Sequence, residues 1–394
     1  MAAQRLKKTL TAHMLICEVW TYLIAGGLGS LGVEVAEFLV EKGARRVILV
    51  SRRALPPRSE WAFISETSPS LANAVQRIQQ LVKQGATICA LAIDISSPTA
   101  VAQLSEALEA LSFPPVSGVV HVAGVLDDEI VLSTTPEAIE RVLAPKVSGT
   151  LTLCTLFPPK TLDFLILFSS AGQIFGTPGQ ALYASANAFL DALAVQRRAQ
   201  GDNAVSIQWT RWCDMGKLDY NDFISAELVC KGVTDISRGE AFRAWTHIST
   251  YDVGQAVVIR SRVFEPEEPL PNMILADIAL RRKANSPSTP TAAQAGQPAQ
   301  SAGDMPSSPA EREAYLENLV RECVANVLKM DSSGVTSKEA LINIGLDSVM
   351  SVHLRGQLQK RLRVQIPATF TWTHPTVEHI VKWLMEKIGS KAAR

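Results

Sequence analysis

The 394-residue sequence lacks the features that mark several common functional classes. None of its six cysteines forms a C-x-x-C pair, so metal-binding and dithiol motifs find no support. No apolar run approaches the roughly 18–20 residues of a membrane span. The first twenty residues make a poor signal peptide, because His13 and Glu18 interrupt their apolar stretch. Basic and acidic residues balance at 38 each, which argues against a nucleic-acid or membrane-surface partner. We therefore expect a cytoplasmic protein with reduced thiols and no metal.

A regular alternation of strand and helix patterns begins at Thr21. Gly43 is expected to end the first of the helices. The alternation predicts an α/β fold, a Rossmann-like doubly wound parallel sheet with helices on both faces. The predicted strands are 21–25, 46–50, 87–93, 117–124, 164–170 and 204–209, and the predicted helices are 31–42, 71–84 and 98–111.

Composition divides the rest of the chain. Residues 1–20 form an atypical N-terminal segment, and 21–282 form the α/β domain. Residues 283–309 are rich in Pro, Ala, Ser and Gln, which cannot bury a core, so we expect a disordered linker. Residues 310–389 are amphipathic, with helices expected near 311–329, 347–362 and 376–388. This predicts a small all-α domain able to fold alone.

Three glycines form a G-x-G-x-x-G motif between the first predicted strand and helix. Gly27 would permit the tight turn, Gly29 would let the backbone approach a pyrophosphate, and Gly32 would let the helix pack closely. The helix N-terminus would offer free N–H groups to the phosphates. The motif predicts a dinucleotide site, although a purely structural turn is the alternative.

The end of the second strand suggests which dinucleotide would bind. Ser51, Arg52 and Arg53 stand where a site for NAD usually has an acidic residue. Arginines instead suit the extra 2′-phosphate of NADP. Asp94 follows the third strand, where it could contact the adenine. A solvated basic loop is the alternative interpretation of the arginine pair.

Four polar residues suggest a carbonyl reduction. Ser170 ends a buried strand, Tyr183 follows thirteen residues later, and Asn187 lies one helical turn beyond it. A tyrosine can protonate the developing alkoxide, and a nearby ammonium such as that of Lys146 would lower its pKa. A serine hydroxyl can hold the substrate oxygen. Taken singly, each residue has an ordinary structural explanation, as a core aromatic, a surface charge or a surface amide.

At these residues the sequence resembles a known family. Residues 21–282 resemble the ketoreductase domain of polyketide synthases, within the short-chain dehydrogenase/reductase superfamily. Most members of the superfamily have a lysine four residues after the tyrosine, whereas Asn187 stands there in this chain. The matching strings are Y-L-I-A-G-G-L-G-S-L-G (22–32), L-V-S-R-R (49–53), V-V-H-V-A-G-V-L-D-D (119–128), V-L-A-P-K-V-S-G-T (142–150), F-S-S-A-G (168–172) and P-G-Q-A-L-Y-A-S-A-N-A-F-L-D-A-L (178–193).

The resemblance implies a role for each residue of this set. Tyr183 would be the proton donor, Lys146 would lower its pKa, and Ser170 would orient the carbonyl. Asn187 would support the site and its proton relay. The implied reaction is the NADPH-dependent reduction of a beta-ketoacyl thioester to the beta-hydroxyacyl thioester.

The resemblance also implies the stereochemistry of the alcohol product and the subfamily of synthase. Leu126, Asp127 and Asp128 resemble the signature of the B-type (3R) alcohol, and Phe175 and Pro178 agree with it. The strings at 205–212, 232–245 and 274–279 look most like partially reducing fungal synthases of the 6-methylsalicylic acid type.

Residues 310–389 resemble a four-helix acyl-carrier domain, through the string I-G-L-D-S-V-M-S-V-H-L-R (344–355). Ser348 would carry 4′-phosphopantetheine at the start of a helix, where the helix N-terminus favours a phosphate. A simple helix cap at Asp347 and Ser348 is the structural alternative. Val349 departs from the leucine that usually follows the serine.

Other departures leave an alternative function open. Ala25 replaces the usual threonine, and only about twenty poorly matching residues precede Thr21, where the family has a structural half-domain. We expect a fragment of a larger synthase that works with ketosynthase and acyltransferase domains and a phosphopantetheinyl transferase. The alternative is an inactive, truncated reductase scaffold that serves only as an acyl carrier, with an apolar face exposed where the half-domain would pack.

Overall fold

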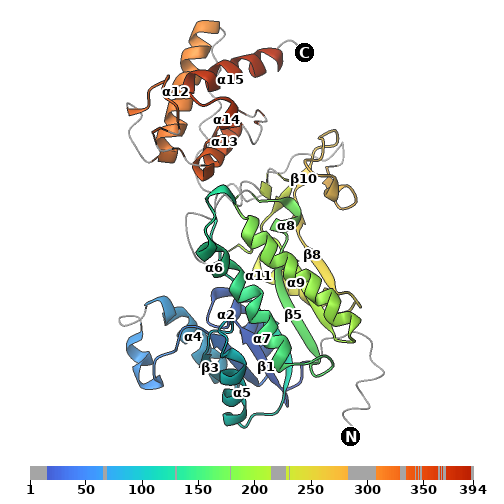
Figure 1. Cartoon of the computed structure of the whole chain (residues 1–394). Coiled ribbons are helices and arrows are strands. Elements are labelled where there is room, and N and C mark those ends of the chain that lie inside the picture. Colours follow the sequence, from blue (N-terminus) through green and yellow to red (C-terminus); the bar gives the residue numbers. More distant parts are fainter. Residues whose placement is uncertain are drawn as a thin grey trace. The chain divides into compact units, whose positions relative to one another are not determined.

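A computed structural model of the chain describes residues 16–64, 69–128, 131–177, 179–213, 228–229, 231–282, 308–328 and 334–391, the last apart from 342, 345, 347, 363, 365 and 367–369. The chain divides into two compact units (Figure 1). The first holds the described residues up to 262 together with 270–279. The second holds 263–269, 280–282 and the described residues from 308 onward. The strand pair β10 (Val263–Phe264) and β11 (Leu280–Arg281) thus groups with the second unit. Residues 283–307 of the predicted linker lie outside the described residues.

A seven-stranded sheet forms the centre of the first unit. Every pairing in it is parallel, in the order β3-β2-β1-β4-β5-β6-β8. The doubly wound parallel sheet predicted from the sequence is confirmed, and β8 is an edge strand that the sequence did not reveal. The strands are β1 (Thr21–Ala25), β2 (Arg46–Ser51), β3 (Thr87–Ala92), β4 (Val116–His121), β5 (Phe164–Ser170), β6 (Ala204–Trp209) and β8 (Gln255–Val258).

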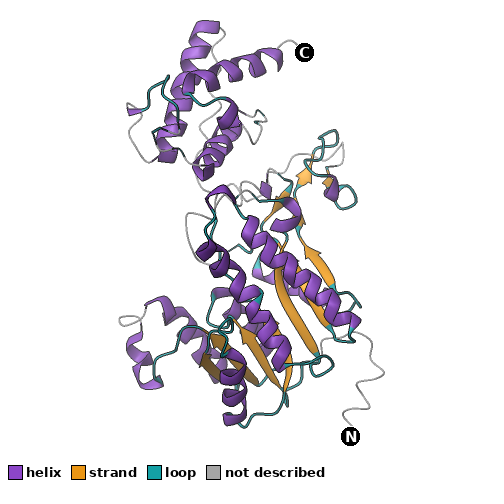
Figure 2. Cartoon of the chain, viewed as in Figure 1, coloured by secondary structure: helices purple, strands orange, loops and turns teal. Residues whose placement is uncertain are grey.

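Helices cover both faces of this sheet (Figure 2). Side chains of β1 alternate between two cores, because successive residues of a strand point to opposite faces. Tyr22 and Ile24 join one core, and Leu23 and Ala25 join the other. The first core is closed by α2 (Ser30–Glu41), α4 (Pro69–Lys83) and α11 (Arg238–Ile248), and the second by α5 (Ala100–Ala110), α7 (Ser148–Leu156) and α9 (Ala181–Ala199).

Further elements complete the first unit, and two of them carry residues of the candidate site. These two are α6 (Pro136–Lys146) and α8 (Gly172–Phe175). Gly43 follows α2 with φ +111°, a conformation that side chains avoid, so the predicted helix stop is confirmed. The remaining short elements are η1 (Arg58–Phe63), η2 (Val131–Ser133), η3 (Met273–Leu275), β7 (Val233–Thr234) and β9 (Arg260–Ser261).

The second unit contains the helices α12 (Pro309–Leu328), α13 (Ser348–Leu362), α14 (Phe370–Thr373) and α15 (Val377–Lys391). Each contributes to one apolar core, in which α12 packs against α13 and α15. The helical C-terminal domain expected from the amphipathic pattern is confirmed. Its core includes Val320, Leu354, Phe370, Ile380 and Leu384.

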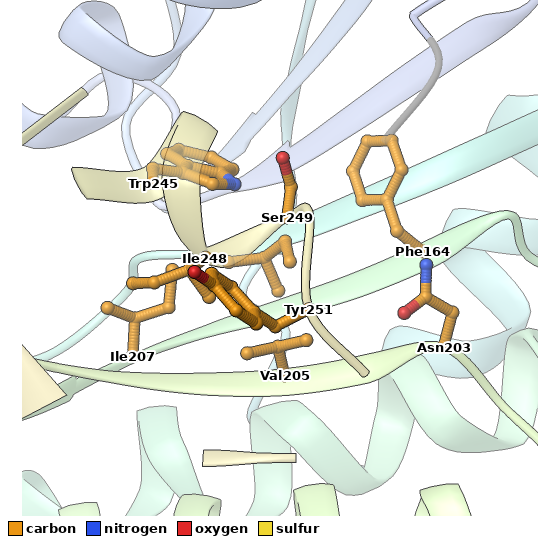
Figure 3. Close-up of a pocket in the computed structure, with 9 residues that line it drawn as sticks. Phe164, Asn203, Val205, Ile207, Trp245, Ile248, Ser249 and Tyr251 are labelled. Atoms are coloured by element: carbon orange, nitrogen blue, oxygen red, sulfur yellow. The ribbon is translucent and has the colours of Figure 1, made fainter. Parts of the chain in front are cut away.

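A small pocket lies at the N-terminal ends of β5 and β6, the opposite edge of the sheet from Ser170 (Figure 3). It offers about 20 Å³, which is room for about one water molecule. The indole N–H of the buried Trp245 has no partner among the described residues. A nucleotide is far too large for this pocket, so the candidate site must lie elsewhere. The lining residues are Phe164, Ile166, Asn203, Val205, Ile207, Trp245, Ile248, Ser249 and Tyr251.

Candidate active site

The glycine loop joins β1 to α2 at the carboxyl edge of the sheet. The N–H groups of Gly26 and Gly27 donate to the carbonyl of Val50 at 2.8 and 3.0 Å, which fastens the loop to β2. The left-handed φ of +87° belongs to Gly26, one residue before the predicted motif. A Cβ at Gly27 would lie 2.7 Å from the Cβ of Leu49, and one at Gly32 would lie 2.3 Å from the Gly26 carbonyl oxygen. The turn conformation expected at Gly27 therefore falls at Gly26, whereas Gly27 and Gly32 are held to glycine by close packing.

The start of α2 fits a phosphate group. Gly29 caps the helix with φ −76° and ψ 165° and supplies no side-chain hydrogen bond. The first turn has no acidic residue, and Ser30 is exposed. The N–H groups at the start of this twelve-residue helix are therefore free of side-chain caps. β1 also lies between β2 and β4, the position where strand order reverses and doubly wound sheets bind nucleotides.

The residues expected to bind the 2′-phosphate and the adenine follow β2 and β3, and one of them, Arg53, contacts the glycine loop. One guanidinium nitrogen of Arg53 donates to the carbonyl of Leu28 at 3.0 Å, and its backbone N–H donates to Ser51 Oγ at 3.2 Å. Arg52 is exposed. Asp94 accepts hydrogen bonds from the N–H and the hydroxyl of Ser96 at 3.0 and 2.6 Å. Two cationic side chains next to the glycine loop fit the extra phosphate of NADP.

Lys146 ends α6 and is 3 % exposed. Its Nζ donates to the carbonyl of Phe168 on β5 at 2.9 Å. Burial lowers the pKa of Lys146 to about 8, and the carboxylate of Asp191 opposes that change. A Cβ at Gly124 would lie 3.0 Å from the Lys146 Cε, so glycine leaves room there for the lysine stem.

Tyr183 and Asn187 share one face of α9. Lys146 Nζ lies 5.7 Å from the centroid of the Tyr183 ring. Burial raises the pKa of Tyr183, a hydrogen bond from Asn187 lowers it, and Asp128 raises it. The phenol is thus protonated at neutral pH, the form that can donate a proton. The sequence led us to expect that Lys146 lowers this pKa. In the structure the pKa of Tyr183 is instead raised, and burial is the largest cause.

Asn187 is fully buried and has one unused polar atom. Its amide nitrogen donates to the backbone carbonyl of Tyr183 at 2.7 Å. Its Oδ1 has no partner among the described residues. A buried acceptor without a partner is a natural position for a water molecule. Asn187 is therefore suited to hold water next to Tyr183.

Ser170 ends β5, two residues beyond the carbonyl that binds Lys146. Its Oγ accepts the backbone N–H of Gly172 at 3.1 Å. The neighbouring Ser169 hydroxyl donates to the carbonyl of Asn187 at 3.4 Å, which joins β5 to α9. The fold thus brings Lys146, Tyr183 and Asn187 into one contact group. Ser170 lies at the end of β5, the strand whose Phe168 carbonyl accepts a hydrogen bond from the lysine.

The loop after β4 holds the residues expected to control stereochemistry. Leu126 is 63 % exposed. Asp127 accepts the Nε of Arg141 at 2.9 Å. The two carboxylate oxygens of Asp128 accept hydrogen bonds from the amide nitrogen of Gln180, at 3.1 and 3.2 Å. Gln180 lies three residues before Tyr183. Burial raises the pKa of Asp128. Phe175 is buried at the end of α8, and Pro178 lies outside the described residues.

Three residues of this region were missed by the sequence patterns: His121, Gln180 and Asp191. His121 ends β4 and is fully buried, and burial lowers its pKa to about 3. The neutral ring contacts the carbonyl of Pro145 through Nε2 at 3.1 Å, next to Lys146. All three lie inside the strings quoted above for the family, but their residue types alone indicate no contact.

In the second unit, Ser348 is the first residue of α13. Asp347 lies outside the described residues, as does the side chain of Ser348. Leu354 and Leu358 anchor α13 in the core of the unit. A fifteen-residue helix therefore begins at the predicted attachment residue.

Family comparisons match both units. Residues 20–214 match a model described as "KR domain", and residues 318–384 match one described as "Phosphopantetheine attachment site". The first implies use of NADPH, and the second implies a covalent 4′-phosphopantetheine and a carrier-bound acyl chain in a multidomain setting. None of the described helices combines the length and apolarity needed to span a bilayer.

Curated relatives match almost the whole chain. It is 59 % identical over 374 residues to a 6-methylsalicylic acid synthase of Aspergillus terreus, which covers 94 % of this chain and 20 % of that one. It is 52 % identical over 369 residues to the enzyme of that name from Penicillium patulum, with 94 % and 20 % coverage. The mellein synthase of Phaeosphaeria nodorum is 44 % identical over 369 residues, with 93 % and 20 % coverage. The chain thus spans about a fifth of the length of these relatives.

Solved structures match the first unit. A ketoreductase from the first module of phoslactomycin biosynthesis in a Streptomyces species is 36 % identical, with a TM-score of 0.54. The match covers 64 % of this chain and 55 % of that one. A ketoreductase domain from the bacillaene assembly line is 29 % identical, with a TM-score of 0.55 and coverage of 64 % and 58 %.

Proposed function

Because this chain carries a ketoreductase domain and a phosphopantetheine attachment domain of the polyketide synthase family, we propose that it reduces a beta-ketoacyl thioester to the beta-hydroxyacyl thioester. NADPH is the reductant. The acyl chain is carried by 4′-phosphopantetheine on Ser348 or on a partner carrier. The observation that carries the proposal is the buried ammonium of Lys146, bonded to the Phe168 carbonyl at 2.9 Å and lying 5.7 Å from the Tyr183 ring.

The glycine loop, Arg52 and Arg53 hold the dinucleotide in this proposal. The free N–H groups at the start of α2 bind its pyrophosphate, and the two arginines bind its 2′-phosphate. Asp94 contacts the adenine end. NADPH bound there supplies a hydride to the carbonyl carbon of the substrate.

The protein supplies the proton, from Tyr183, and the positive charge that stabilises the phenolate, from Lys146. The Ser170 hydroxyl donates a hydrogen bond to the substrate carbonyl oxygen, which orients it. As the carbon–oxygen double bond opens, the oxygen takes the phenolic proton of Tyr183. The Lys146 ammonium stabilises the phenolate left behind. Water bound at the free Oδ1 of Asn187 returns a proton to the phenolate. The balance is one new C–H bond, one new O–H bond and one proton drawn from solvent.

The finer assignments belong to the same proposal. Leu126, Asp127 and Asp128 favour the B-type (3R) alcohol, and the curated relatives favour a synthase of the 6-methylsalicylic acid type. The partners are ketosynthase and acyltransferase domains and a phosphopantetheinyl transferase. We propose domain limits of 21–282 and 310–389. The family models match the narrower ranges 20–214 and 318–384, and residues 263–269 and 280–282 group with the second unit. We infer a cytoplasmic location, since the described cysteines are free thiols.

Replacing Tyr183 by phenylalanine tests the proposal. Purified wild-type protein is expected to oxidise NADPH with a soluble beta-ketoacyl thioester, and Tyr183→Phe is expected to lose at least about a hundredfold of that rate. NADPH affinity, measured by nucleotide fluorescence, stays unchanged because the phenol does not hold the dinucleotide. Equal turnover by the two proteins would refute the role of Tyr183. Phosphopantetheine attachment to a wild-type protein that binds no NADPH would favour the inactive carrier scaffold.

A further inference from the structure

Asp191 is a buried carboxylate that the reaction scheme above does not use. It lies on α9 and is 5 % exposed. Its carboxylate accepts hydrogen bonds from the amide of Gln208 at 2.8 Å, the hydroxyl of Ser206 and the amide of Gln173. Its backbone carbonyl accepts the amide of Gln255 at 3.0 Å. A buried charge is costly unless it is well bonded, so this set of donors indicates a built site for the carboxylate.

The four donors come from three separate elements of the first unit. Ser206 and Gln208 lie on β6, Gln255 lies on β8, and Gln173 lies on α8, three residues after Ser170. Asp191 itself is two helical turns beyond Tyr183 on α9. The Asp191 side chain therefore joins α9, which carries Tyr183, to α8, which follows Ser170.

Asp191 also balances the charge of Lys146. Among the described residues, His121 on β4 contacts the Pro145 carbonyl next to that lysine, the Tyr183 ring lies 5.7 Å from the lysine Nζ, and Asp191 acts on the lysine through its charge. His121 is neutral, and Tyr183 is protonated at neutral pH. Asp191 is the one whose charge favours the ammonium, and it opposes the lowering of the Lys146 pKa by burial.

We propose that Asp191 is a positioning residue for the reduction. Its hydrogen bonds to Gln173 and β6 fix α9 against the end of β5, and its negative charge keeps Lys146 in the ammonium form. The inference rests on the proposed ketoreduction, since Lys146 matters to the rate only through Tyr183.

The test compares two buried carboxylates as asparagine variants of the full chain. Asp202, the control, pairs with the buried Arg197 at the amino edge of the sheet, away from the glycine loop. We measure NADPH affinity, kcat, KM and the pH profile of kcat with a soluble beta-ketoacyl thioester. Asp191→Asn is expected to lower kcat by about tenfold or more with NADPH affinity unchanged. The alkaline decline of its kcat is expected about one pH unit below that of the wild type.

Asp202→Asn is expected to lower thermal stability without moving the alkaline decline of kcat. A purely structural role for Asp191 would leave its pH profile at the wild-type position and would refute the charge role. An equal shift of the alkaline decline of kcat in Asp191→Asn and Asp202→Asn would also refute the charge role. A third variant, Gln173→Met, keeps the charge and removes one bond, so it is expected to lower kcat without a pH shift. Wild-type kcat in Gln173→Met would overturn the anchoring role, even if Asp191→Asn does not fold.

The two levels of proposal fail in different ways. A wild-type chain that oxidises no NADPH, or a fully active Tyr183→Phe, would overturn the proposed function and this inference with it. An active wild type whose Asp191→Asn variant behaves as Asp202→Asn does would overturn the inference alone.

Discussion

Replacing Lys146 by methionine should remove the activity and, at neutral pH, make the first unit more stable. Methionine keeps an unbranched stem of similar length but carries no charge. Burial lowers the pKa of Lys146 from 10.5 to about 8. Each pKa unit corresponds to about 1.4 kcal/mol, so the folded state disfavours this ammonium by about 3.5 kcal/mol. The substitution also removes the hydrogen bond from the charged amine to the Phe168 carbonyl, which costs about 2 kcal/mol. The net gain at pH 7 is about 1.5 kcal/mol.

The pH dependence of this gain follows from linkage. The pKa of Lys146 is lower in the folded state than in the unfolded chain, so the unfolded chain binds more protons between about pH 8 and 10.5. The free energy of unfolding of the wild type therefore rises with pH through that window. In Lys146→Met, residue 146 does not titrate, so it adds no such rise to the free energy of unfolding. The advantage of this variant at pH 7 should shrink above pH 8 and reverse in sign at about pH 9.

Calorimetric unfolding of both proteins at pH 7 and pH 10 measures the effect. The transition of the first unit is identified as the one that NADPH moves to higher temperature. At pH 7 we expect a melting temperature about 2–8 °C higher for Lys146→Met, with thioester reduction abolished and NADPH binding kept. The exposed Lys83, replaced in the same way, should change neither stability nor rate. A Lys146→Met protein less stable than the wild type at pH 7, or a difference that is the same at both pH values, would refute the reasoning.

Three other variants test the remaining parts of the proposal. Gly32→Ala would put a Cβ 2.3 Å from the carbonyl oxygen of Gly26, so the loop must move. Fluorescence titration should then show NADPH binding weakened by about tenfold or more. An unchanged affinity would contradict the assignment of this loop to the nucleotide. Removing both cations with Arg52→Ala and Arg53→Ala should weaken binding of NADPH about tenfold and of NADH little, and equal losses for the two nucleotides would count against a 2′-phosphate site. Ser348→Ala should block phosphopantetheine attachment, seen by intact mass, while reduction of a soluble thioester continues at the wild-type rate; attachment that persists would show that another residue carries the arm.

Most of the first unit could be predicted from short patterns. Six apolar stretches become six of the seven strands of the sheet. Five of them are inner strands, for which burial on both faces favours a nearly continuous apolar sequence, and the sixth, β3, lies at an edge. The edge strand β8 was missed because its residues are alternately exposed and half-buried, over only four positions. The glycine motif was found, but its left-handed turn falls at Gly26 rather than Gly27, and a repeated Gly-Gly pair does not reveal which of the two has that conformation.

The candidate site was predicted in part. The positions of Lys146, Tyr183 and Asn187 came from the family pattern, and the structure joins them through contacts between α6, β5 and α9. Asp191 and His121 were missed, because an aspartate in a helix and a histidine at a strand end have many ordinary roles. Their partners lie 15 to 24 residues away in sequence, in other elements of the fold.

The sequence by itself determined the alternation of buried strands and helices, the phosphate loop between two of them, and the family to which both units are related. These are local properties, because a repeat of apolar residues or a glycine requirement is present in a short stretch of chain. Only the tertiary structure decided the electrostatics of the site. The pKa of Lys146 is lowered by its burial, and the negative charge of Asp191 opposes that lowering. Desolvation and charge attraction depend on distances between residues far apart in the chain, which folding alone brings together.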